Sequence, residues 1–506
     1  MSIDFLSLRV LGGLFLIYTA GSYVHAWYRL RHIKGPFLAS FSYFWMLFNS
    51  MKHNQGDSCG DLANKYGNLV RIGPSDVLTA DPSVIRRMNA ARSRYGKSNW
   101  YKPLRFSSDY EFMFSLTDVG VHDRLKAQTS HGYAGKEVPT IEQDISEQIQ
   151  ILVELIRRKY ISTKEFVPAD LALLSQYFTL DAISKISFGE AFGYLKTEND
   201  TYGYMQTGDD IIFTTSLAAD VPWLGRILGI PAVNNLIAPR STDKQGMGVI
   251  LGQVNVNYFP GALAEDLVAK RFAPDAKDEM DMLGSFKRHG LTARECRAEI
   301  PFQILAGSDT TARAIRVTLL YLMSSPRDYR ALQKEIDDGI SQGIISNPVQ
   351  ACEGRNLPYL QGVIYEGLRL SLPATILAMK EAPPEGDYID DKFIPGGTRI
   401  GVAIKGVMRS TSVFGADAGL FRPERWLNLD PTQRRNMVDT AELIFGYGRF
   451  GCSGKPVALL ELNMIFIELL RNFDFQIVNP QKPIEQSINT QGWVDKGMWV
   501  KITDRH

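Results

Sequence analysis

The sequence predicts a mainly α-helical fold with a small β component, arranged as one large domain. Three observations support this prediction. Apolar residues recur at helical spacing through most of the chain from Ile141 onward. Strand-like stretches are short and lie at 69–72, 77–79 and 399–404. No linker rich in Pro, Gly or Ser divides the chain after Pro36, and no internal repeat is visible.

The composition is that of an ordinary globular protein of 506 residues, with 45% hydrophobic and 22% charged residues. The formal net charge of +1 does not indicate a nucleic-acid partner. Its four cysteines are far apart and no Cys-x-x-Cys or His-x-x-x-His pair occurs, so structural zinc is not predicted. So few cysteines in so long a chain indicate reduced thiols and a domain that faces the cytosol.

The N-terminal segment predicts a membrane anchor. Val10–Trp27 contains no Asp, Glu, Lys or Arg, and a basic cluster follows it at 29–34. That run is at the short end for a membrane span, and a cleaved signal peptide is the alternative. Because the basic residues lie on the C-terminal side of the apolar run, the rest of the chain is expected in the cytoplasm. We therefore divide the chain into residues 1–36, an anchor that ends in the helix-breaking Gly35-Pro36, and residues 37–506, the catalytic domain.

Two helices precede the most informative one. Ile141–Tyr160 alternates apolar and charged residues at helical spacing, and Leu171–Phe188 is an apolar helix that ends near Gly189. A helix over Thr292–Ser324 follows. Thr292-Ala-Arg-Glu295 is a capping box that predicts where it begins, and Ser325-Pro326 ends it.

In the middle of that long helix stands Ala306-Gly-Ser-Asp-Thr-Thr311, a run of poor helix formers. A Thr hydroxyl there bonds back to the carbonyl four residues earlier and bends the helix. The middle of one face is small and polar, which leaves room for a ligand such as dioxygen. The alternative is a kinked helix that packs closely through its small residues. The residues that share this face are Gln303, Ala306, Gly307, Thr310 and Ala314.

A further helix begins at Pro358 and carries Glu366 and Arg369 on one face. An exposed ion pair of this spacing contributes little stability and is the commoner case. Apolar neighbours favour burial here. The proline-turned segment Phe421–Trp426 follows later in the chain and brings Arg425 within reach of Glu366.

Near the C-terminus, Cys452 stands in a glycine-rich bend that precedes a helical run over Val457–Leu470. A thiolate at that place faces backbone N–H groups and the positive end of a helix, as a haem ligand would. Gly446, Gly448 and Gly451 also fit the G-x-G-x-x-G pattern of a dinucleotide site, although little chain follows for such a domain. The loop alone leaves open a haem-thiolate site, a phosphate loop and a plain turn.

Taken in order, these four segments resemble the cytochrome P-450 family of haem-thiolate monooxygenases. The family's F-x-x-G-x-x-x-C-x-G matches Phe445, Gly448, Cys452 and Gly454. Its A-G-x-D-T-T, E-x-x-R and P-E-R-F motifs match Ala306–Thr311, the Glu366 helix and Pro423–Trp426. The anchor is similar to that of microsomal members, and the cysteine loop is most similar to fungal pisatin-demethylase-like members.

The resemblance implies roles by position. Cys452 would be the axial ligand of a haem b, in a loop that also contacts the haem through Phe445, Gly446 and Gly454. Thr310 and Asp309 would be the alcohol and the acid that deliver protons during the activation of dioxygen. A buried triad would hold the loop in place, and its members are Glu366, Arg369 and Arg425.

The sequence departs from the family pattern where haem propionates are bound. Phe450 stands two residues before the cysteine, where Arg or His is usual. His122 and Lys126 replace the usual Trp and Arg of one helix, and Lys380 stands where another Arg is usual. We expect these three residues to bind the propionates. The alternative for His122 is a solvated helix histidine.

The family geometry also implies an apolar substrate pocket, which suits a small molecule of fungal secondary metabolism that is hydroxylated or epoxidised. Electrons would come from NADPH through a separate cytochrome reductase, with cytochrome b5 as a further donor. Arg449, Lys455 and Arg124 are candidate contacts for the reductase. We expect a single-pass protein of the endoplasmic reticulum membrane with a cytosolic catalytic domain. The pocket residues implied are Phe112, Gln303, Ala306, Thr375, Ile376 and Trp493.

Three other functions compete with this interpretation. An enzyme of the same fold that rearranges or dehydrates its substrate would not need the Asp309-Thr310 pair. A nicotinamide dehydrogenase would use the glycine loop and contain no iron. A non-catalytic haem-binding protein would explain Cys452 but leave Asp309-Thr310 unexplained.

Overall fold

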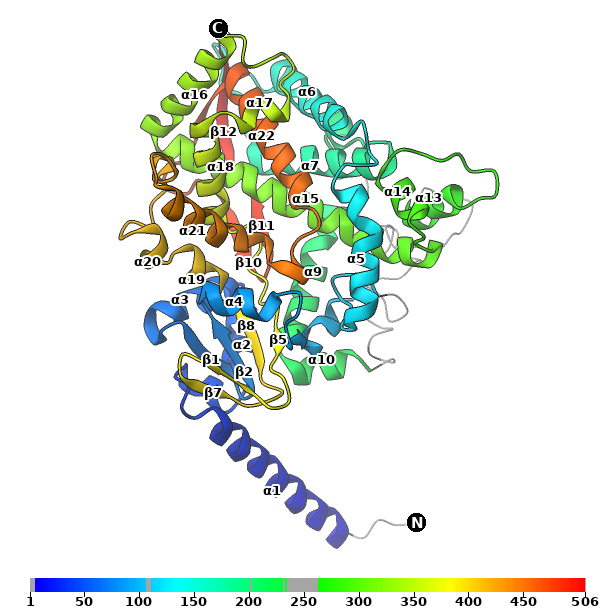
Figure 1. Cartoon of the computed structure of the whole chain (residues 1–506), viewed down its shortest axis with the longest axis vertical. Helices are drawn as coiled ribbons and strands as arrows, with labels where there is room; N and C mark the ends of the chain where they lie inside the picture. Colours follow the sequence, from blue (N-terminus) through cyan, green and yellow to red (C-terminus); the bar gives the residue numbers. More distant parts are fainter. Residues whose placement is uncertain (1–4, 106–110, 201–202, 231–232, 234–262, 506) are drawn as a thin grey trace.

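A computed structural model of the chain describes residues 5–105, 111–200, 203–230, 233 and 263–505. Its body is mainly helical, and the long helix α15 (Ala293–Ser324) crosses the middle of it (Figure 1). Helix α7 (Leu171–Phe188) packs along α15 so closely that a side chain at Gly307 would collide with Ile183. α18 (Pro358–Ser371) and α22 (Lys455–Asn472) also contact α15.

The predicted helices form within a residue or two of the expected bounds. Thr292 accepts the backbone N–H of Glu295, while the Glu295 side chain accepts the Thr292 N–H, so both halves of the capping box are present. Asp170 caps α7, and Gly189 ends that helix in the left-handed conformation.

The remaining helical segments surround this centre. The helices are α1 (Phe5–Leu30), α2 (Phe44–Met51), α3 (Gln55–Tyr66), α4 (Pro82–Asn89), α5 (Val119–Tyr133), α6 (Ile141–Lys159), α8 (Tyr194–Thr197), α9 (Tyr204–Asp220), α10 (Pro222–Leu228), α13 (Leu263–Arg271), α14 (Met282–Arg288), α16 (Pro326–Ser341), α17 (Ala351–Arg355), α19 (Ile404–Met408), α20 (Thr411–Phe414) and α21 (Pro431–Ala441). The short 3-10 turns are η1 (Phe37–Ser40), η2 (Asn99–Leu104), η3 (Pro423–Trp426), η4 (Glu442–Phe445) and η5 (Gly448–Phe450).

The largest sheet has five strands and lies below the helical body in Figure 1. Its order is β1-β2-β8-β5-β3, in which β2 and β8 run parallel and the other neighbours run antiparallel. The three predicted strands are β1, β2 and β8. The members of this sheet are β1 (Leu69–Gly73), β2 (Asp76–Thr79), β3 (Gly96–Lys97), β5 (Lys380–Glu381) and β8 (Arg399–Val402).

The C-terminal strands did not emerge from the sequence reading. β12 (Trp499–Asp504) pairs with β9 (Phe473–Ile477) and β4 (Pro168–Asp170), and β10 (Gln486–Asn489) pairs with β11 (Trp493–Lys496). The signal was present in β9, whose residues Phe473, Asp474 and Phe475 alternate between buried and exposed. A further hairpin joins β6 (Asp387–Ile389) to β7 (Lys392–Ile394).

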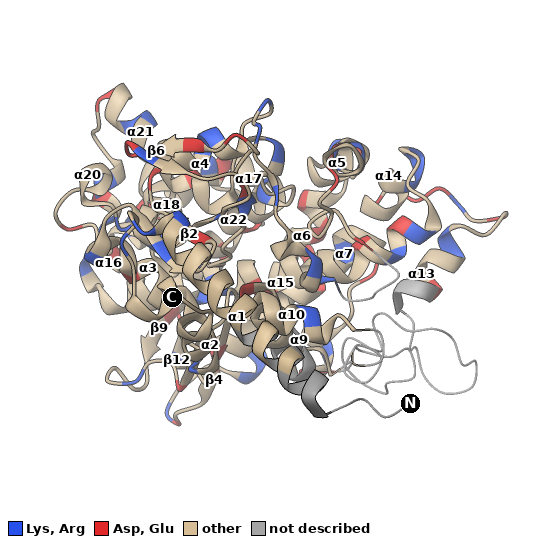
Figure 2. Cartoon of the chain, turned by 90° about the horizontal axis from the view of Figure 1, so that it is seen from below, with Lys and Arg blue, Asp and Glu red and all other residues tan. Residues whose placement is uncertain are grey.

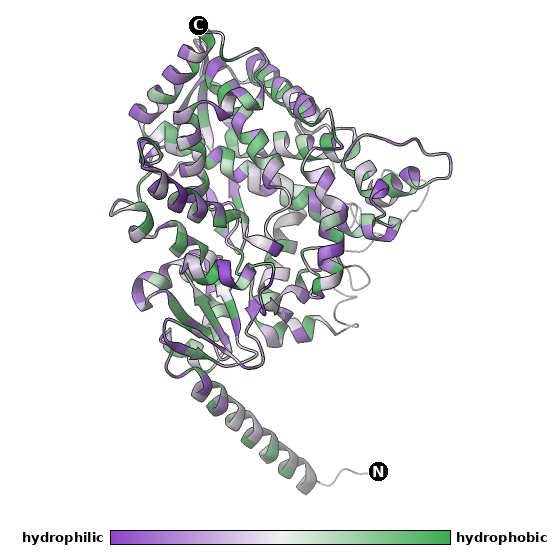
Figure 3. Ribbon diagram, in the orientation of Figure 1, coloured by the Kyte–Doolittle hydropathy of each residue, from purple (hydrophilic) through white to green (hydrophobic). Residues whose placement is uncertain are grey.

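The N-terminal helix α1 projects from the body, and the part of it coloured in Figure 3 carries hydrophobic residues among hydrophilic ones (Figures 1 and 3). Within the described residues, no helix is both long enough and apolar enough to cross a membrane. The predicted transmembrane helix over Val10–Trp27 is therefore not supported. The helix itself forms, but polar residues such as Thr19, Ser22 and His25 dilute its apolar character.

The C-terminal end of α1 is attached to the body. The buried Arg71 of β1 donates to the carbonyls of Ala26 (2.8 Å) and Trp27 (3.2 Å). Leu30 and Ile33 are buried against residues of the five-stranded sheet. The helix ends at Leu30, five residues before the expected break at Gly35-Pro36.

Candidate active site

Cys452, which the sequence predicts to be a thiolate ligand, lies in the loop just before α22. The Cys452 N–H donates to the carbonyl of Phe445 at 2.7 Å, and the Gly451 N–H donates to that of Gly448 at 3.1 Å. These bonds close a tight bend in which Gly446 and Cys452 are exposed, while Phe445 and Gly454 are half-buried. A planar ligand can therefore approach the backbone of this bend.

Glycine is required at Gly448 for two reasons. Its φ is +56°, a conformation that residues with side chains rarely adopt. A Cβ atom there would also lie 2.4 Å from the carbonyl oxygen of Asn89, at the end of α4. The G-x-G-x-x-G reading of the loop thus reflects a close approach of two backbones, and phosphate binding is not needed to explain it.

The thiol of Cys452 is under opposing influences. The surrounding protein raises its pKa by desolvation. Backbone N–H groups of Gly454 and Lys455, together with the ammonium groups of Lys126 and Lys455, act in the opposite direction and favour the thiolate. A positive metal ion bound at the sulfur would add to that second influence and keep the thiolate form.

Beside the loop, basic side chains gather around the ring of Phe450. The Lys380 ammonium lies 3.2 Å from the ring centroid, and that of Lys97 lies 5.4 Å away. The His122 ring lies 4.9 Å from the Phe450 ring, centroid to centroid. The predicted residues His122, Lys126 and Lys380 are thus brought to one place, together with Lys97, which the sequence analysis did not single out.

Lys380 is the most unusual member of this cluster. It is only 1% exposed, and its ammonium has no hydrogen-bond partner in the described part of the chain. Burial, and then the charge of Lys97, hold its pKa well below the usual range. A buried cation without a partner is costly, so this site suits an anionic group such as a carboxylate. The two propionates of a haem supply that chemistry, and the donor set fits them.

The other members already have protein partners. Lys126 donates to the carbonyls of Arg449 (2.7 Å) and Gly451 (2.6 Å), so it fastens the loop that carries Cys452. Lys97 donates to the carbonyl of Phe114 at 2.8 Å, and burial lowers its pKa to about 7. His122 contacts Asp123 (3.0 Å), and burial, followed by the charge of Lys97, lowers its pKa to about 4. His122 is therefore neutral at pH 7.

The small, polar middle of α15, for which the sequence predicts a bend, is contacted from the α7 side. Thr310 donates its hydroxyl to the carbonyl of Ala306 at 2.8 Å, as expected for a back-bonded threonine. Asp309 accepts a hydrogen bond from the Gln176 amide of α7 at 2.6 Å and one from Ser308 at 3.3 Å. Ala306, Asp309 and Thr310 are half-buried, so the middle of α15 is partly accessible at these residues.

Glu461 of α22 is a second acid beside the middle of α15, and the apolar pattern of its helix concealed it in the sequence. It is 2% exposed and shares a hydrogen bond with the neighbouring Thr311 side chain. Burial raises its pKa to about 8, so the carboxyl group is mostly neutral at pH 7. Glu461 thereby connects α22, the helix that follows Cys452, to Thr311 in the middle of α15.

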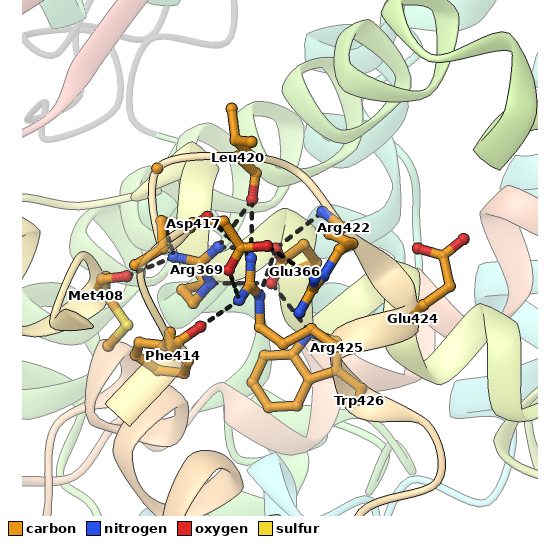
Figure 4. A network of polar contacts seen from close by, with 12 residues as sticks. Glu366, Arg369, Met408, Phe414, Asp417, Leu420, Arg422, Glu424, Arg425 and Trp426 are labelled. Carbon is orange, nitrogen blue, oxygen red and sulfur yellow. Dashed lines mark hydrogen bonds and ion pairs between the residues drawn. The ribbon is translucent and has the colours of Figure 1, made fainter. Parts of the chain in front are cut away.

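The Glu366 cluster is a buried network (Figure 4). Arg369 donates to both carboxylate oxygens of Glu366, at 2.7 and 2.9 Å, and Arg425 donates to one at 3.2 Å. Trp426 and the Arg422 N–H donate to the same carboxylate at 3.0 Å each. The surface ion pair considered as the alternative is therefore wrong, because both side chains of the Glu366–Arg369 pair are fully buried.

Arg369 and Arg425 also tie down the segments before η3. Arg369 donates to the carbonyls of Met408 (2.6 Å) and Ala418 (2.5 Å). Arg425 donates to Asp417 (2.7 Å), which adds a second carboxylate to the cluster. Glu366 and Asp417 thus give each buried guanidinium group a carboxylate partner, and Asp417 also pairs with the exposed Arg422 at 2.9 Å.

The predicted pocket residues fall into two groups. Phe112 is buried and stacks on Phe302 of α15, with ring centroids 4.5 Å apart. Gln303 is not accessible as the residues in the middle of α15 are, since it is buried and its amide lies 2.9 Å from the sulfur of Met282. It is thus held toward α14, away from the half-buried Ala306.

The second group forms a wall of two paired segments. Thr375 donates its hydroxyl to Asn489 at 2.6 Å, and Ala374 bridges Gly492 in antiparallel fashion. The indole N–H of Trp493 donates to the carbonyl of Leu372 at 2.7 Å. Thr375 is buried, whereas Ile376 and Trp493 are half-buried.

The three basic residues considered as partner contacts are already engaged within the chain. Arg449 pairs with Asp123 (3.1 Å), Lys455 with Glu442 (2.9 Å) and Arg124 with Glu295 (2.6 Å). Basic and acidic side chains are also interspersed in the view from below (Figure 2). The attraction of these three residues for an acidic partner protein would be weakened by their acidic neighbours.

The apolar region near Ile211–Ile237 is divided between core and surface, and its last residues lie largely outside the described part. Leu217 and Leu224 are half-buried against the core cluster around Trp100. Trp223 and Ile227 of α10 are 40% and 46% exposed. Some residues of this segment thus pack against the core, whereas others are exposed at the surface.

Comparison with known proteins adds the family context. The cytochrome P450 family model matches residues 262–496. The chain is 44% identical over 499 residues to cytochrome P450 monooxygenase ABA1 of Pyricularia oryzae, covering 97% of this chain and 95% of that protein. It is 42% identical over 480 residues to cytochrome P450 monooxygenase aba1 of Botryotinia fuckeliana (94% and 92%). Cytochrome P450 monooxygenase abl1 of Leptosphaeria maculans is 35% identical over 465 residues (90% and 80%).

Proposed function

This chain belongs to the cytochrome P450 family and is a haem-dependent monooxygenase, and from that premise we propose which residues form its active site and which substrates it takes. The family implies a haem with a cysteine thiolate ligand and a redox partner that supplies electrons. The proposal rests above all on one observation: Cys452 lies exposed in a glycine bend beside a buried cationic cluster.

Cys452 is the axial ligand in this proposal. The N–H groups of Gly454 and Lys455 point toward its sulfur and stabilise the thiolate, and Lys126 fastens the loop through the carbonyls of Arg449 and Gly451. When bound, a haem with such a ligand supplies the chemistry that activates dioxygen and inserts one oxygen atom into an apolar small molecule. Phe445, Gly446 and Gly454 line the bend against which the haem lies.

Lys380 binds one haem propionate, because its buried ammonium needs an anionic partner. Lys97 and His122 lie around the same Phe450 ring and complete the polar surroundings of the propionates. Lys126 differs from them, since its hydrogen bonds are already made to the loop. Phe450, which takes the place of the usual Arg or His, supplies a ring on which the Lys380 ammonium rests.

Asp309 and Thr310 move protons toward the site where dioxygen is activated. Gln176 holds the Asp309 carboxylate from the α7 side, while the Thr310 hydroxyl is oriented by its bond to Ala306. The triad of Glu366, Arg369 and Arg425 has a structural role. It holds the segments around η3 on α18 and takes no part in the reaction.

The substrate is an apolar small molecule of fungal secondary metabolism. Aromatic and aliphatic side chains support this class: Phe112, which stacks on Phe302 of α15, and the half-buried Ile376 and Trp493. Thr375 and Gln303 are buried and already hydrogen-bonded, so they shape the wall more than they bind a polar group. Ala306 leaves space beside the bend of α15.

Electrons come from NADPH through a cytochrome reductase, with cytochrome b5 as a second donor, and we place the enzyme at the endoplasmic reticulum membrane. Two exposed apolar surfaces support membrane contact. One is α1, with Leu14, Ile17 and Val24 exposed, and the other is α10, with Trp223 and Ile227 exposed. Both lie toward the lower end of the molecule in Figure 1.

The function is tested by following the oxygen atom. The purified enzyme is reconstituted with NADPH and a fungal cytochrome reductase and offered a panel of terpenoids and polyketides under ¹⁸O₂. We expect products that gain one ¹⁸O atom and that require both NADPH and oxygen. Products that form without NADPH and oxygen would instead support a rearranging or dehydrating enzyme of the same fold.

A further inference from the structure

Asp220, the last residue of α9, lies where three distant segments of the chain meet. Its carboxylate oxygen Oδ1 accepts a hydrogen bond from the indole N–H of Trp100 in η2 at 2.7 Å. The same oxygen accepts one from the side-chain amide of Gln491, in the turn between β10 and β11, at 2.9 Å. Asp220 and Trp100 are no more than 1% exposed, and Gln491 is 4% exposed, so water does not compete for these bonds.

No cation neutralises Asp220 in the described part of the chain. Arg399, the closest basic influence on it, is engaged in its own buried ion pair with Asp76. Cys59 of α3 faces the same carboxyl group. Burial raises the pKa of Asp220 to about 7, so the group bears a desolvation penalty. Its contribution is to position two other segments, because one carboxylate oxygen accepts hydrogen bonds from both Trp100 and Gln491.

The residue that Asp220 holds in the hairpin is itself in an unusual conformation. Gln491 has φ +77°, which a residue with a side chain adopts only when its surroundings keep it there. Its carbonyl accepts the backbone N–H of Thr375 at 2.8 Å. Together with the Ala374–Gly492 bridge, this contact fixes the segment 372–376 against the segment 489–493.

We infer that Asp220 is a positioning residue for the substrate site. By holding Trp100 and Gln491 on one oxygen atom, it fixes the wall that carries Thr375 and Trp493 against the end of α9. Gly492 in the same turn lies against Ile212 of α9, where a Cβ atom would stand 3.6 Å from a methyl carbon, so the two elements are in contact along the turn. The inference rests on the proposed function, which makes this wall one side of a substrate pocket.

A wall fixed in advance favours large ligands, since a loose wall must be ordered when such a ligand binds. Small ligands that touch only the haem iron are indifferent to it. Two nitrogen ligands of the iron, imidazole and the bulky azole econazole, therefore separate the wall from the rest of the site. Both shift the Soret band to the red on binding, so affinity is read from spectra of the purified full-length holoenzyme without turnover.

We expect Asp220→Ala to weaken econazole binding about tenfold, the consequence of losing two hydrogen bonds to a charged acceptor. Imidazole binding should change by less than about twofold. Asp220→Asn should recover most of the econazole affinity, because the amide oxygen accepts the same two N–H groups. The control is Glu335→Gln, which alters a half-buried carboxyl group of α16 that accepts two backbone N–H groups away from this wall, and this variant should bind both ligands as the wild type does.

The inference is overturned if Asp220→Ala binds econazole as tightly as the wild type, if it loses affinity for both ligands equally, or if Asp220→Asn gives no recovery. Should Asp220→Ala fail to fold, Trp100→Phe removes one donor and keeps the carboxylate, and unchanged econazole binding by that variant equally overturns the inference. A wild-type protein without the carbon monoxide band of thiolate-ligated haem would instead overturn the proposed function. The two failures are thus distinct.

Discussion

At the scale of single residues, the site combines groups that are expensive to bury with groups that need a partner. Lys380 is buried and has no hydrogen-bond partner among the described residues, and Glu461 is buried as a mostly neutral acid. Thr310 and Asp309 are only half-buried, in the middle of α15. Each of these residues therefore has a distinct consequence when it is replaced.

Thr310→Ala should retain haem and bind substrate but uncouple the reaction, so that NADPH is consumed and peroxide is released in place of product. The hydroxyl that helps to move protons is lost, while helix stability changes little because Ala is the better helix former. The ratio of peroxide to product, measured in the reconstituted system, checks this. Full product yield per NADPH would contradict the proton-delivery role.

Lys380→Met should lower the haem content of the purified protein, because the replacement removes a buried cation that we assign to a propionate. The apoprotein should melt at a similar or higher temperature, since a buried charge without a partner is also removed. Lys334→Met, which alters an exposed lysine of α16, is the control and should keep its haem. Equal haem content in both variants would show that Lys380 does not bind the cofactor.

At the scale of elements, local signals predicted those parts of the fold that strong local chemistry determines. The capping box at Thr292 fixed the start of α15, and the apolar run 171–188 became α7 without change. Among the C-terminal strands, β10 and β11 were missed because their residues do not alternate between buried and exposed. Their positions depend on pairing with distant segments, such as the contact of Gln491 with Asp220.

The site follows the same division. Cys452, the Glu366 pair and the Asp309-Thr310 pair lie in recognisable motifs. Lys97 and Gln176 have no motif around them, and they reach the site only because β3 and α7 pack there. The transmembrane prediction is not supported within the described residues: it counted charges, and α1 also carries uncharged polar residues such as Thr19 and Ser22.

Glu461 gives the contact between α22 and α15 a pH dependence. Its pKa in the folded protein, about 8, is raised above the ordinary value of 4.5. The folded state thus holds a proton that the unfolded state loses, and stability is lost as the pH rises from about 4.5 toward 8. Glu461→Gln removes this term, so the variant should gain about 2 °C in melting temperature relative to the wild type between pH 5.5 and pH 8.

Differential scanning fluorimetry at both pH values measures this gain, and Glu154→Gln on the exposed face of α6 is the control. A melting-temperature difference between Glu461→Gln and the wild type that is the same at both pH values would show that Glu461 does not carry a buried proton.

At the scale of the whole molecule, the N-terminal helix has two parts with different roles. Its outer part projects from the body with Leu14 and Ile17 exposed, whereas Leu30 lies in the core and the carbonyls near Ala26 satisfy the buried Arg71. A deletion of residues 1–22 should therefore reduce membrane attachment and leave the fold intact. A deletion through Ile33 should destabilise the protein, because it removes two of the four carbonyl groups that accept hydrogen bonds from the Arg71 side chain.

Fractionation of both deletion variants at low and high salt, together with their carbon monoxide spectra, checks this. We expect some attachment to remain in the shorter deletion, through Trp223 and Ile227 of α10. Equal haem content and equal melting temperatures for the two variants would contradict the structural role of the Ala26–Ile33 segment.

The central claim is that Cys452 supplies the thiolate ligand of a haem, and the carbon monoxide spectrum of the reduced, purified protein tests it most directly. We expect the strongly red-shifted Soret band of thiolate-ligated haem in the wild type and in Cys296→Ala and Cys352→Ala, and its loss in Cys452→Ala. A band typical of histidine-ligated haem in the wild type, or a red-shifted band that survives in Cys452→Ala, would contradict the claim.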